Sequence, residues 1–171
     1  MKRLALAAAA SLLLSACGYH VAGRADLLPR HLRSIAIPAF ANATIHYTLT
    51  QSLPQAIGRE FIRRTRYQIV ADPAEADATL EGAVLQYVAY PTVTDPATGR
   101  AAGVQMILVL DIKLRDAKSG AVLFERPAMV VQHRYEISSD QLAYLEESDA
   151  AFERISLEVA RSVVSAILEN F

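Results

Sequence analysis

The clearest structural signal in this chain is an alternation of side chains over residues 104–115. One face of the run is apolar throughout and consists of Val104, Met106, Leu108, Leu110, Ile112 and Leu114. The opposite face carries Gln105, Asp111, Lys113 and Arg115. A period of two with one apolar face is typical of a β-strand that packs one side on a core. Because Ile107 and Val109 also fall on the second face, we expect the middle of that face to be covered too.

Shorter segments around this run predict further strands, turns and loops. Strands are expected over residues 34–40, 67–70, 79–90 and 121–136. Loops or turns are expected over residues 41–44, 72–77, 91–103 and 116–120. Proline cannot donate a hydrogen bond to a strand ladder, so Pro38 closes the first strand. For the same reason, Pro127 either breaks the last strand or marks it as an edge strand.

Two amphipathic helices are predicted. Leu53, Ile57 and Phe61 recur every fourth residue and indicate a helix over residues 50–66, whose segment 52–55 resembles a capping box. A second helix is expected to start near Ser148 or Asp149. Its apolar side chains extend past half of its circumference, which is wider than packing on a sheet alone requires. We therefore expect it to contact either the first helix or another protein, and we prefer the first helix.

The order of these elements predicts an α+β fold. We expect two helices packed on one face of a mixed, mostly antiparallel β-sheet, which makes a two-layer sandwich. The turn at residues 116–120 joins two of the longer strands as a hairpin.

The amino-terminal segment predicts export and lipid attachment. Lys2 and Arg3 precede an apolar run over residues 4–14, and Ser15 and Ala16 lead to Cys17, the only cysteine of the chain. A charged start, a short apolar run and small residues before a cleavage site make a secretory signal. The run is shorter than the ~20 residues that a transmembrane helix needs. The segment ending in Cys17 resembles a bacterial lipobox, in which the cysteine is acylated and becomes the first residue of the mature protein.

Cleavage at this site divides the chain into three parts: residues 1–16 as a lipoprotein signal peptide, residues 17–33 as a lipidated lead, and residues 34–171 as a single α+β domain. Gly18 stands where inner-membrane retention signals usually carry Asp, which favours the periplasmic face of the outer membrane. Residues 1–16 contain two basic and no acidic residues, so their removal takes the formal charge from −1 to −3. A nucleic-acid-binding protein needs a concentrated basic face, which this chain lacks.

Catalytic signatures are missing from the sequence. The four histidines are scattered, and the chain has neither a nucleophile elbow, a zinc-binding H-E-x-x-H, nor a glycine-rich phosphate loop. Acidic residues cluster at 72–77 and 146–149, where we interpret them as loop or helix-start residues rather than a catalytic pair. With Cys17 lipidated, no thiol remains for a disulfide or a metal site. We expect a binding protein without cofactor or metal, and give a periplasmic hydrolase little weight.

Two arginines are candidate ligand contacts. Arg100 lies in the predicted loop beside Gly99, and Arg134 follows His133 near the end of the last strand. Guanidinium groups make bidentate hydrogen bonds to phosphate, so these side chains are suited to hold a phosphorylated lipid. Solvent exposure without a ligand remains the alternative for each of them.

Two blocks of sequence carry a family resemblance. Residues 17–23, Cys-Gly-Tyr-His-Val-Ala-Gly, are similar to the mature start of the lipopolysaccharide-assembly lipoproteins of the LptE family. Residues 35–44 resemble the IxxPxFxNxT stretch of that family, with Ile35, Pro38, Phe40, Asn42 and Thr44 at the defined positions. The resemblance implies an outer-membrane lipoprotein that plugs the LptD β-barrel, helps it to assemble and contacts lipopolysaccharide. Arg100 lies near the loop implicated in that contact.

The opening pattern of strand, proline, phenylalanine, asparagine, threonine and helix also resembles two other classes of lipoprotein. One class regulates peptidoglycan synthases, as LpoB does, and the other forms secretion channels, as CsgG does. The start at Gly18 and the long C-terminal helix favour the LptE family.

Overall fold

The computed structural model describes residues 29, 31–96, 99, 101–136 and 141–170, and within 141–149 only the backbone. The signal peptide and almost all of the predicted lipidated lead lie outside the described residues. In chain order, the elements are β1 (Ser34–Ala36), β2 (Ala41–Asn42), α2 (Leu49–Arg64), β3 (Gln68–Val70), a 3-10 helix (Pro73–Glu75), β4 (Ala78–Thr94), β5 (Ala101–Asp116), β6 (Val122–Glu136) and α3 (Gln141–Glu169).

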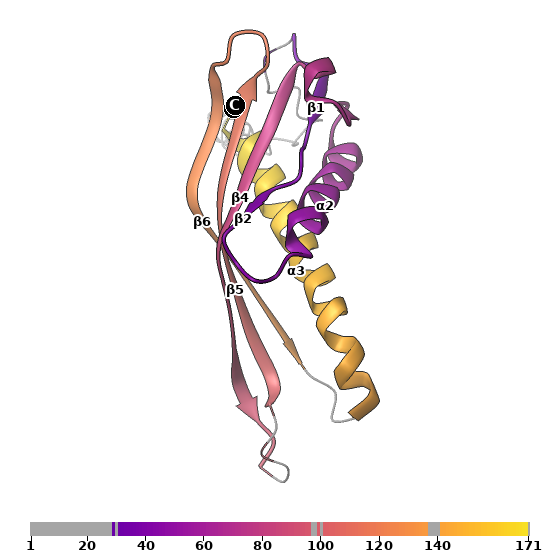
Figure 1. The fold of residues 1–171 in the computed structure, drawn as a ribbon, viewed down its shortest axis with the longest axis vertical. Coiled ribbons are helices and arrows are strands. Elements are labelled where there is room, and N and C mark those ends of the chain that lie inside the picture. Colours follow the sequence, from indigo (N-terminus) through magenta and orange to yellow (C-terminus); the bar gives the residue numbers. More distant parts are fainter. Residues whose placement is uncertain (1–28, 30, 97–98, 100, 137–140, 171) are drawn as a thin grey trace, which may run out of the picture.

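The strands form one mixed sheet in the order β3-β1-β4-β5-β6, with β2 paired to β4 beside this path. The short strands β1, β2 and β3 make parallel pairs, whereas the long ladders β4–β5 and β5–β6 are antiparallel. Helices α2 and α3 lie against the same face of the sheet, and the β4–β5 hairpin extends far beyond α2 (Figure 1). The predicted fold class, α+β with two helices on one face of a mixed sheet, is confirmed.

The core lies between the helices and the sheet. The apolar face of β5 alternates with the predicted period, and its residues from Val104 to Leu114 are buried. Leu53, Ile57 and Phe61 of α2 and Ile155, Val159 and Val163 of α3 pack onto this face. Burying one such side chain contributes about 1.5–3 kcal/mol to the free energy of folding.

The broad apolar surface of α3 is explained by α2. The two helices pack side by side, and Arg64 Nη1 donates to Ser165 Oγ at 2.7 Å while Ser156 Oγ lies 3.2 Å from Ser52 Oγ. The preference for contact with the first helix is confirmed.

Several predicted boundaries were wrong. The first strand ends at Ala36 rather than at residue 40, and residues 41–42 of the predicted loop form β2, which pairs with β4. Long-range pairing also moved the boundaries of the next two strands. β4 continues past residue 90 to Thr94 and β5 begins at Ala101, so most of the predicted loop over residues 91–103 is hairpin. Pro91 is tolerated because no described strand pairs with the other side of β4 at this level, so its missing N–H need not serve a ladder. Helix α3 starts at Gln141 rather than near Ser148, since residues 141–147 contain no glycine or proline.

The start of α2 also differs from the prediction. The helix begins at Leu49, and Thr48 makes no side-chain cap, so the predicted capping box at residues 52–55 is wrong and Pro54 lies inside the helix. Residue 54 would normally donate to the carbonyl of Thr50. Proline cannot, and this carbonyl instead accepts the N–H of Phe40 at 3.0 Å. Pro54 therefore frees an acceptor that ties the segment before α2 to the helix.

Of the two alternatives for Pro127, the edge strand is confirmed, and β6 continues through the proline. β6 is the outer strand of the sheet, and its pairing with β5 shifts between Met129 and Arg126. Two residues of β6, Pro127 and Ala128, thus face the single residue Asp111, and Ala128 adopts a φ of 50°. This is a β-bulge, which disrupts the edge of β6 as a template for further strands.

Candidate functional site

The connection between β2 and α2, residues 43–48, is held in place by Asn42. Its Oδ1 accepts hydrogen bonds from the backbone N–H and the hydroxyl of Thr44, both at 2.8 Å. Its Nδ2 donates to the carbonyl of His46 at 2.9 Å. One amide side chain therefore satisfies three groups of a loop that has few backbone hydrogen bonds of its own.

His46 is the residue of this connection whose side chain packs against the sheet and α3. Its ring lies 4.3 Å from the ring of Tyr87 on β4 and 5.3 Å from that of Phe152 on α3, as measured between centroids. Burial raises the pKa of the Tyr87 hydroxyl above its ordinary value. On either side of His46, Ile45 and Tyr47 point outward and are 81% and 77% exposed. We call these two residues the loop pair. Ile45 and Tyr47 alternate with His46 in the sequence, and this was the signal that the sequence interpretation missed.

Phe40 anchors the start of the connection. Its ring is buried against the backbone of Gly82 on β4, where an added Cβ would lie 2.4 Å from two ring carbons. Only glycine leaves room for the ring at this position. The segment 35–44, which carries the family resemblance, thus serves first as a structural clamp.

The face of the sheet that points away from the helices has two parts. The part nearest the 116–120 turn is charged and paired: Lys113 Nζ lies 2.6 Å from Glu125 Oε1, and Arg115 Nε lies 3.1 Å from Glu81 Oε2. The part toward the β4–β5 hairpin begins with apolar side chains. There, Val88 lies opposite Ile107 and Val109 opposite Val130, and Val88 and Val130 are exposed.

We call these four apolar residues the outer strip. No described element covers the outer strip, although Ile107 and Val109 are half-buried, so the expectation that the middle of this face is covered stays a prediction. Ile107 and Val109 were nevertheless the sequence signal for this strip.

Arg134 lies at the end of the outer strip. It is exposed on β6 and faces Gln105 across the strands, which in turn faces Tyr90. His133 pairs with Met106, so its side chain belongs to the helix side of the sheet and is separated from Arg134. Arg100 and Cys17 lie outside the described residues. The structure therefore places one of the two predicted ligand arginines, beside an apolar surface.

The acidic residues of the 72–77 cluster accept hydrogen bonds from backbone N–H groups and so stabilise the fold. Asp72 Oδ1 accepts from the N–H of Ala74 and caps the 3-10 helix. Asp77 Oδ2 accepts from the N–H of Arg33 at 2.9 Å, which lowers the pKa of the Asp77 carboxyl. The interpretation of the 72–77 cluster as loop or cap residues is confirmed. For the 146–149 cluster the predicted place at a helix start was wrong, because α3 begins at Gln141 and these residues lie inside it.

Asp116 organises the β5–β6 turn. Its Oδ1 accepts from the N–H groups of Lys118 and Ser119, and its Oδ2 lies 2.6 Å from His31 Nε2. These hydrogen bonds hold the pKa of Asp116 far below its usual range. The bond from the Ser119 N–H has the largest effect, and the bond with His31 has the second largest. Within the described residues, His, Asp and Glu form no cluster of three or more that could hold a metal ion.

Comparison with known proteins identifies the family. The model of the LptE family, described as lipopolysaccharide-assembly, matches residues 32–167. The chain belongs to the LptE family. Residues 35–44 fall inside the matched range, so the resemblance read from them is confirmed. None of the curated proteins matches this chain in sequence.

Solved structures share the LptE-like fold. The rare lipoprotein B from Shewanella oneidensis aligns with a TM-score of 0.50 and 13% identity, covering 80% of this chain and 94% of its own. An uncharacterized lipoprotein B from Nitrosomonas europaea gives 0.53 and 15%, covering 89% and 96%. A Xanthomonas campestris protein gives 0.52 and 16%, covering 85% and 89%. At these identities the likeness establishes the fold alone. Among the described helices of this chain, none combines the length and apolarity needed to cross a membrane.

Proposed function

We propose that this chain is an outer-membrane lipoprotein, acylated at Cys17 and facing the periplasm, that forms a complex with the LptD β-barrel. In this role it assists assembly of the barrel, plugs it, and supports transport of lipopolysaccharide to the outer leaflet. The match of the LptE family model over residues 32–167 carries the proposal. It favours this role over a regulator of peptidoglycan synthases or a secretion-channel subunit.

The chain acts in this proposal by binding. The described carboxylates Asp72, Asp77 and Asp116 are engaged in backbone hydrogen bonds that hold turns together. These hydrogen bonds lower the pKa of the Asp77 and Asp116 carboxyl groups, which makes both of them poor general acids at neutral pH. The exposed surfaces, namely the loop pair and the outer strip, are apolar and suit contacts with a partner or a lipid.

For lipopolysaccharide, we propose Arg134 and Arg100 as contacts to phosphate. Arg134 is exposed and stands beside the outer strip, so one ligand could place a phosphate on the guanidinium and acyl chains on the apolar side chains. Losing one such charge-assisted hydrogen bond weakens binding about tenfold, since 1.4 kcal/mol corresponds to a factor of ten. Arg134→Glu should therefore lower lipopolysaccharide affinity by at least that factor. Arg154→Glu, which makes the same charge change at an exposed site on α3, is the matched control.

The complex itself is tested by isolating the tagged lipoprotein from outer membranes. We expect a large β-barrel that is heat-modifiable on gels to copurify in near-equal amounts. A penicillin-binding protein or a homo-oligomeric ring as the stoichiometric companion would contradict the proposed role. The Cys17→Ala variant should move from the membrane fraction to the soluble periplasmic fraction, because it has no acylation site.

A further inference from the structure

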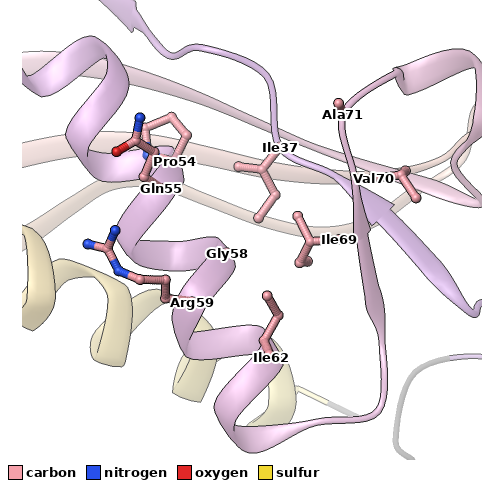
Figure 2. Close-up of a pocket in the computed structure, with 9 residues that line it drawn as sticks. All are labelled: Ile37, Pro54, Gln55, Gly58, Arg59, Ile62, Ile69, Val70 and Ala71. Carbon is pink, nitrogen blue, oxygen red and sulfur yellow. The ribbon is translucent and has the colours of Figure 1, made fainter.

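An apolar groove lies between α2 and the edge of the sheet. It has a volume of about 440 Å³ and is bounded by Gly58 and Ile62 of α2, Ile69 of β3 and Ile37, which follows β1. Figure 2 shows the three isoleucine side chains gathered between the helix and β3, while the Arg59 side chain, which also lines the groove, extends from α2 away from them. Ile62 is 62% exposed, so one wall of this edge groove is open to solvent.

The strand beside the groove has a free edge. β3 is the last strand of the described sheet and pairs with β1 on one side. No described strand pairs with its other side. Backbone groups alternate in direction along a strand, and the Gln68 N–H is bonded to the carbonyl of Arg33 at 2.9 Å, so the N–H and C=O of Ile69 point away from the sheet. An extended chain can add to such an edge by backbone hydrogen bonds, and alternate side chains then face the helix that flanks it.

A positive charge lies at the rim of the groove, on α2. The Arg59 guanidinium is exposed and has no ion-pair partner among the described residues, whereas the next two arginines of α2, Arg63 and Arg64, both pair with Glu60. An apolar groove, a free strand edge and an unpaired cation together select an extended peptide that offers an apolar side chain and a carboxylate. A bare acyl chain would use only the first of these features.

We infer that the edge groove is a docking site for an extended segment of the β-barrel partner. That segment adds to β3 as a strand, places one apolar side chain between Ile37, Ile62 and Ile69, and sets a carboxylate against Arg59. The inference rests on the proposed function, because the barrel is the partner proposed there.

The test uses the full-length lipoprotein in cells with a photocrosslinking amino acid, p-benzoylphenylalanine, in place of Ile62 or Ala71. We expect both positions to crosslink to one short segment of the copurifying barrel, identified by mass spectrometry. When Gly58→Leu is combined with the photocrosslinking residue, the yield of the crosslinked product with the barrel, which we call the adduct, should fall at least fivefold. The leucine side chain would extend past Ile69 into the groove. Gly58→Ala is the control, since its Cβ would meet Ile69 and Ile37 only at ordinary contact distances of 3.6 and 3.9 Å.

A second variant tests the charge without changing the packing. Arg59→Glu should reduce the same adduct at least fivefold, and Arg154→Glu should leave it unchanged. An acidic residue within the crosslinked barrel segment, changed to lysine, should restore the adduct of Arg59→Glu. Failure of both Gly58→Leu and Arg59→Glu to change the adduct would overturn the inference.

The remaining outcomes separate this inference from the proposed function. If the barrel copurifies but the crosslinks go to lipopolysaccharide or to a second copy of this chain, or do not form, the docking inference is wrong while the proposed function stands. If the wild-type lipoprotein brings down no barrel, both are wrong.

Discussion

Substitution of Gly82 by alanine should destabilise this protein, although alanine is usually the better strand residue. The new Cβ would lie 2.4 Å from Cε2 and Cζ of Phe40 and 2.6 Å from Cδ2. Carbon atoms in optimal contact are about 3.5–4.0 Å apart, so the ring must move by more than ~1 Å. The ring is 2% exposed and its backbone N–H is bonded to Thr50, so both the side chain and the main chain resist this shift.

The expected magnitude follows from two opposing effects. Overpacking of a buried site costs about 1–3 kcal/mol. Replacing glycine by alanine lowers the conformational entropy of the unfolded chain, which raises the unfolding free energy by about 0.4–1 kcal/mol. The net loss of unfolding free energy should be roughly 1–2 kcal/mol, which lowers Tm by roughly 2–8 °C for a domain of this size. Urea and thermal unfolding of the protein produced without residues 1–17 measure both quantities.

Two variants make this result specific to the ring contact. Gly58→Ala places its Cβ in ordinary contact and should instead stabilise α2 by about 0.5–1 kcal/mol. Phe40→Leu removes the ring, so Gly82→Ala should cost at least about 0.5 kcal/mol less in that background than in the wild type. A Gly82→Ala protein as stable as the wild type would refute the reasoning, as would strict additivity with Phe40→Leu.

Further predictions concern the loop, the β5–β6 turn and the membrane anchor. Asn42→Ala should lower the unfolding free energy by about 2 kcal/mol in urea titrations, because three hydrogen bonds are lost, although the His46 carbonyl keeps the N–H of Leu49 as a donor. Ile45→Ala should change it by less than about 0.5 kcal/mol. Because the pKa of folded Asp116 lies below its ordinary value of 3.8, its contribution is present above about pH 4 and is lost as the pH falls further. The stability difference between wild type and Asp116→Asn should therefore shrink between pH 6 and pH 3, and an unchanged difference would contradict the assignment. Fractionation of cells should find Cys17→Ala in the soluble periplasm, and retention in the membrane would argue against the lipid anchor.

Elements with strong periodicity could be predicted from the sequence, and the exceptions have physical causes. The alternation over residues 104–115 predicted β5 to within three residues at its start, since one buried face enforces that pattern. The start of α2 was predicted wrongly, because the sequence pattern places Pro54 in the first turn. The Thr50 carbonyl that Pro54 leaves without a helical donor accepts the N–H of Phe40 instead, and no local sequence pattern indicates this contact. The end of β4 was missed because pairing with β5 carries the strand through Pro91.

The candidate surfaces could be predicted only in part. Arg134 was found because an arginine near a strand end is visible in the sequence, and Ile107 and Val109 indicated an unusual second face. The edge groove could not be predicted, since it exists only where β3 becomes the outermost strand beside α2. Strand order is a property of the whole chain, and no local pattern around Ile69 or Gly58 reports it.

The block that carries the family resemblance and the exposed loop pair lie next to each other in the segment that leads to α2. Phe40 needs Gly82 and Asn42 closes the loop, so substitutions at these residues lower the stability of the fold and affect any activity only indirectly. Ile45 and Tyr47 lie between these anchors and α2, yet they are among the most exposed apolar side chains of the described chain. Changing Ile45 and Tyr47 to serine should therefore leave the unfolding free energy nearly unchanged. A loss of barrel copurification in that stable variant would assign the loop pair to the interface. The same loss in Asn42→Ala would report only on folding.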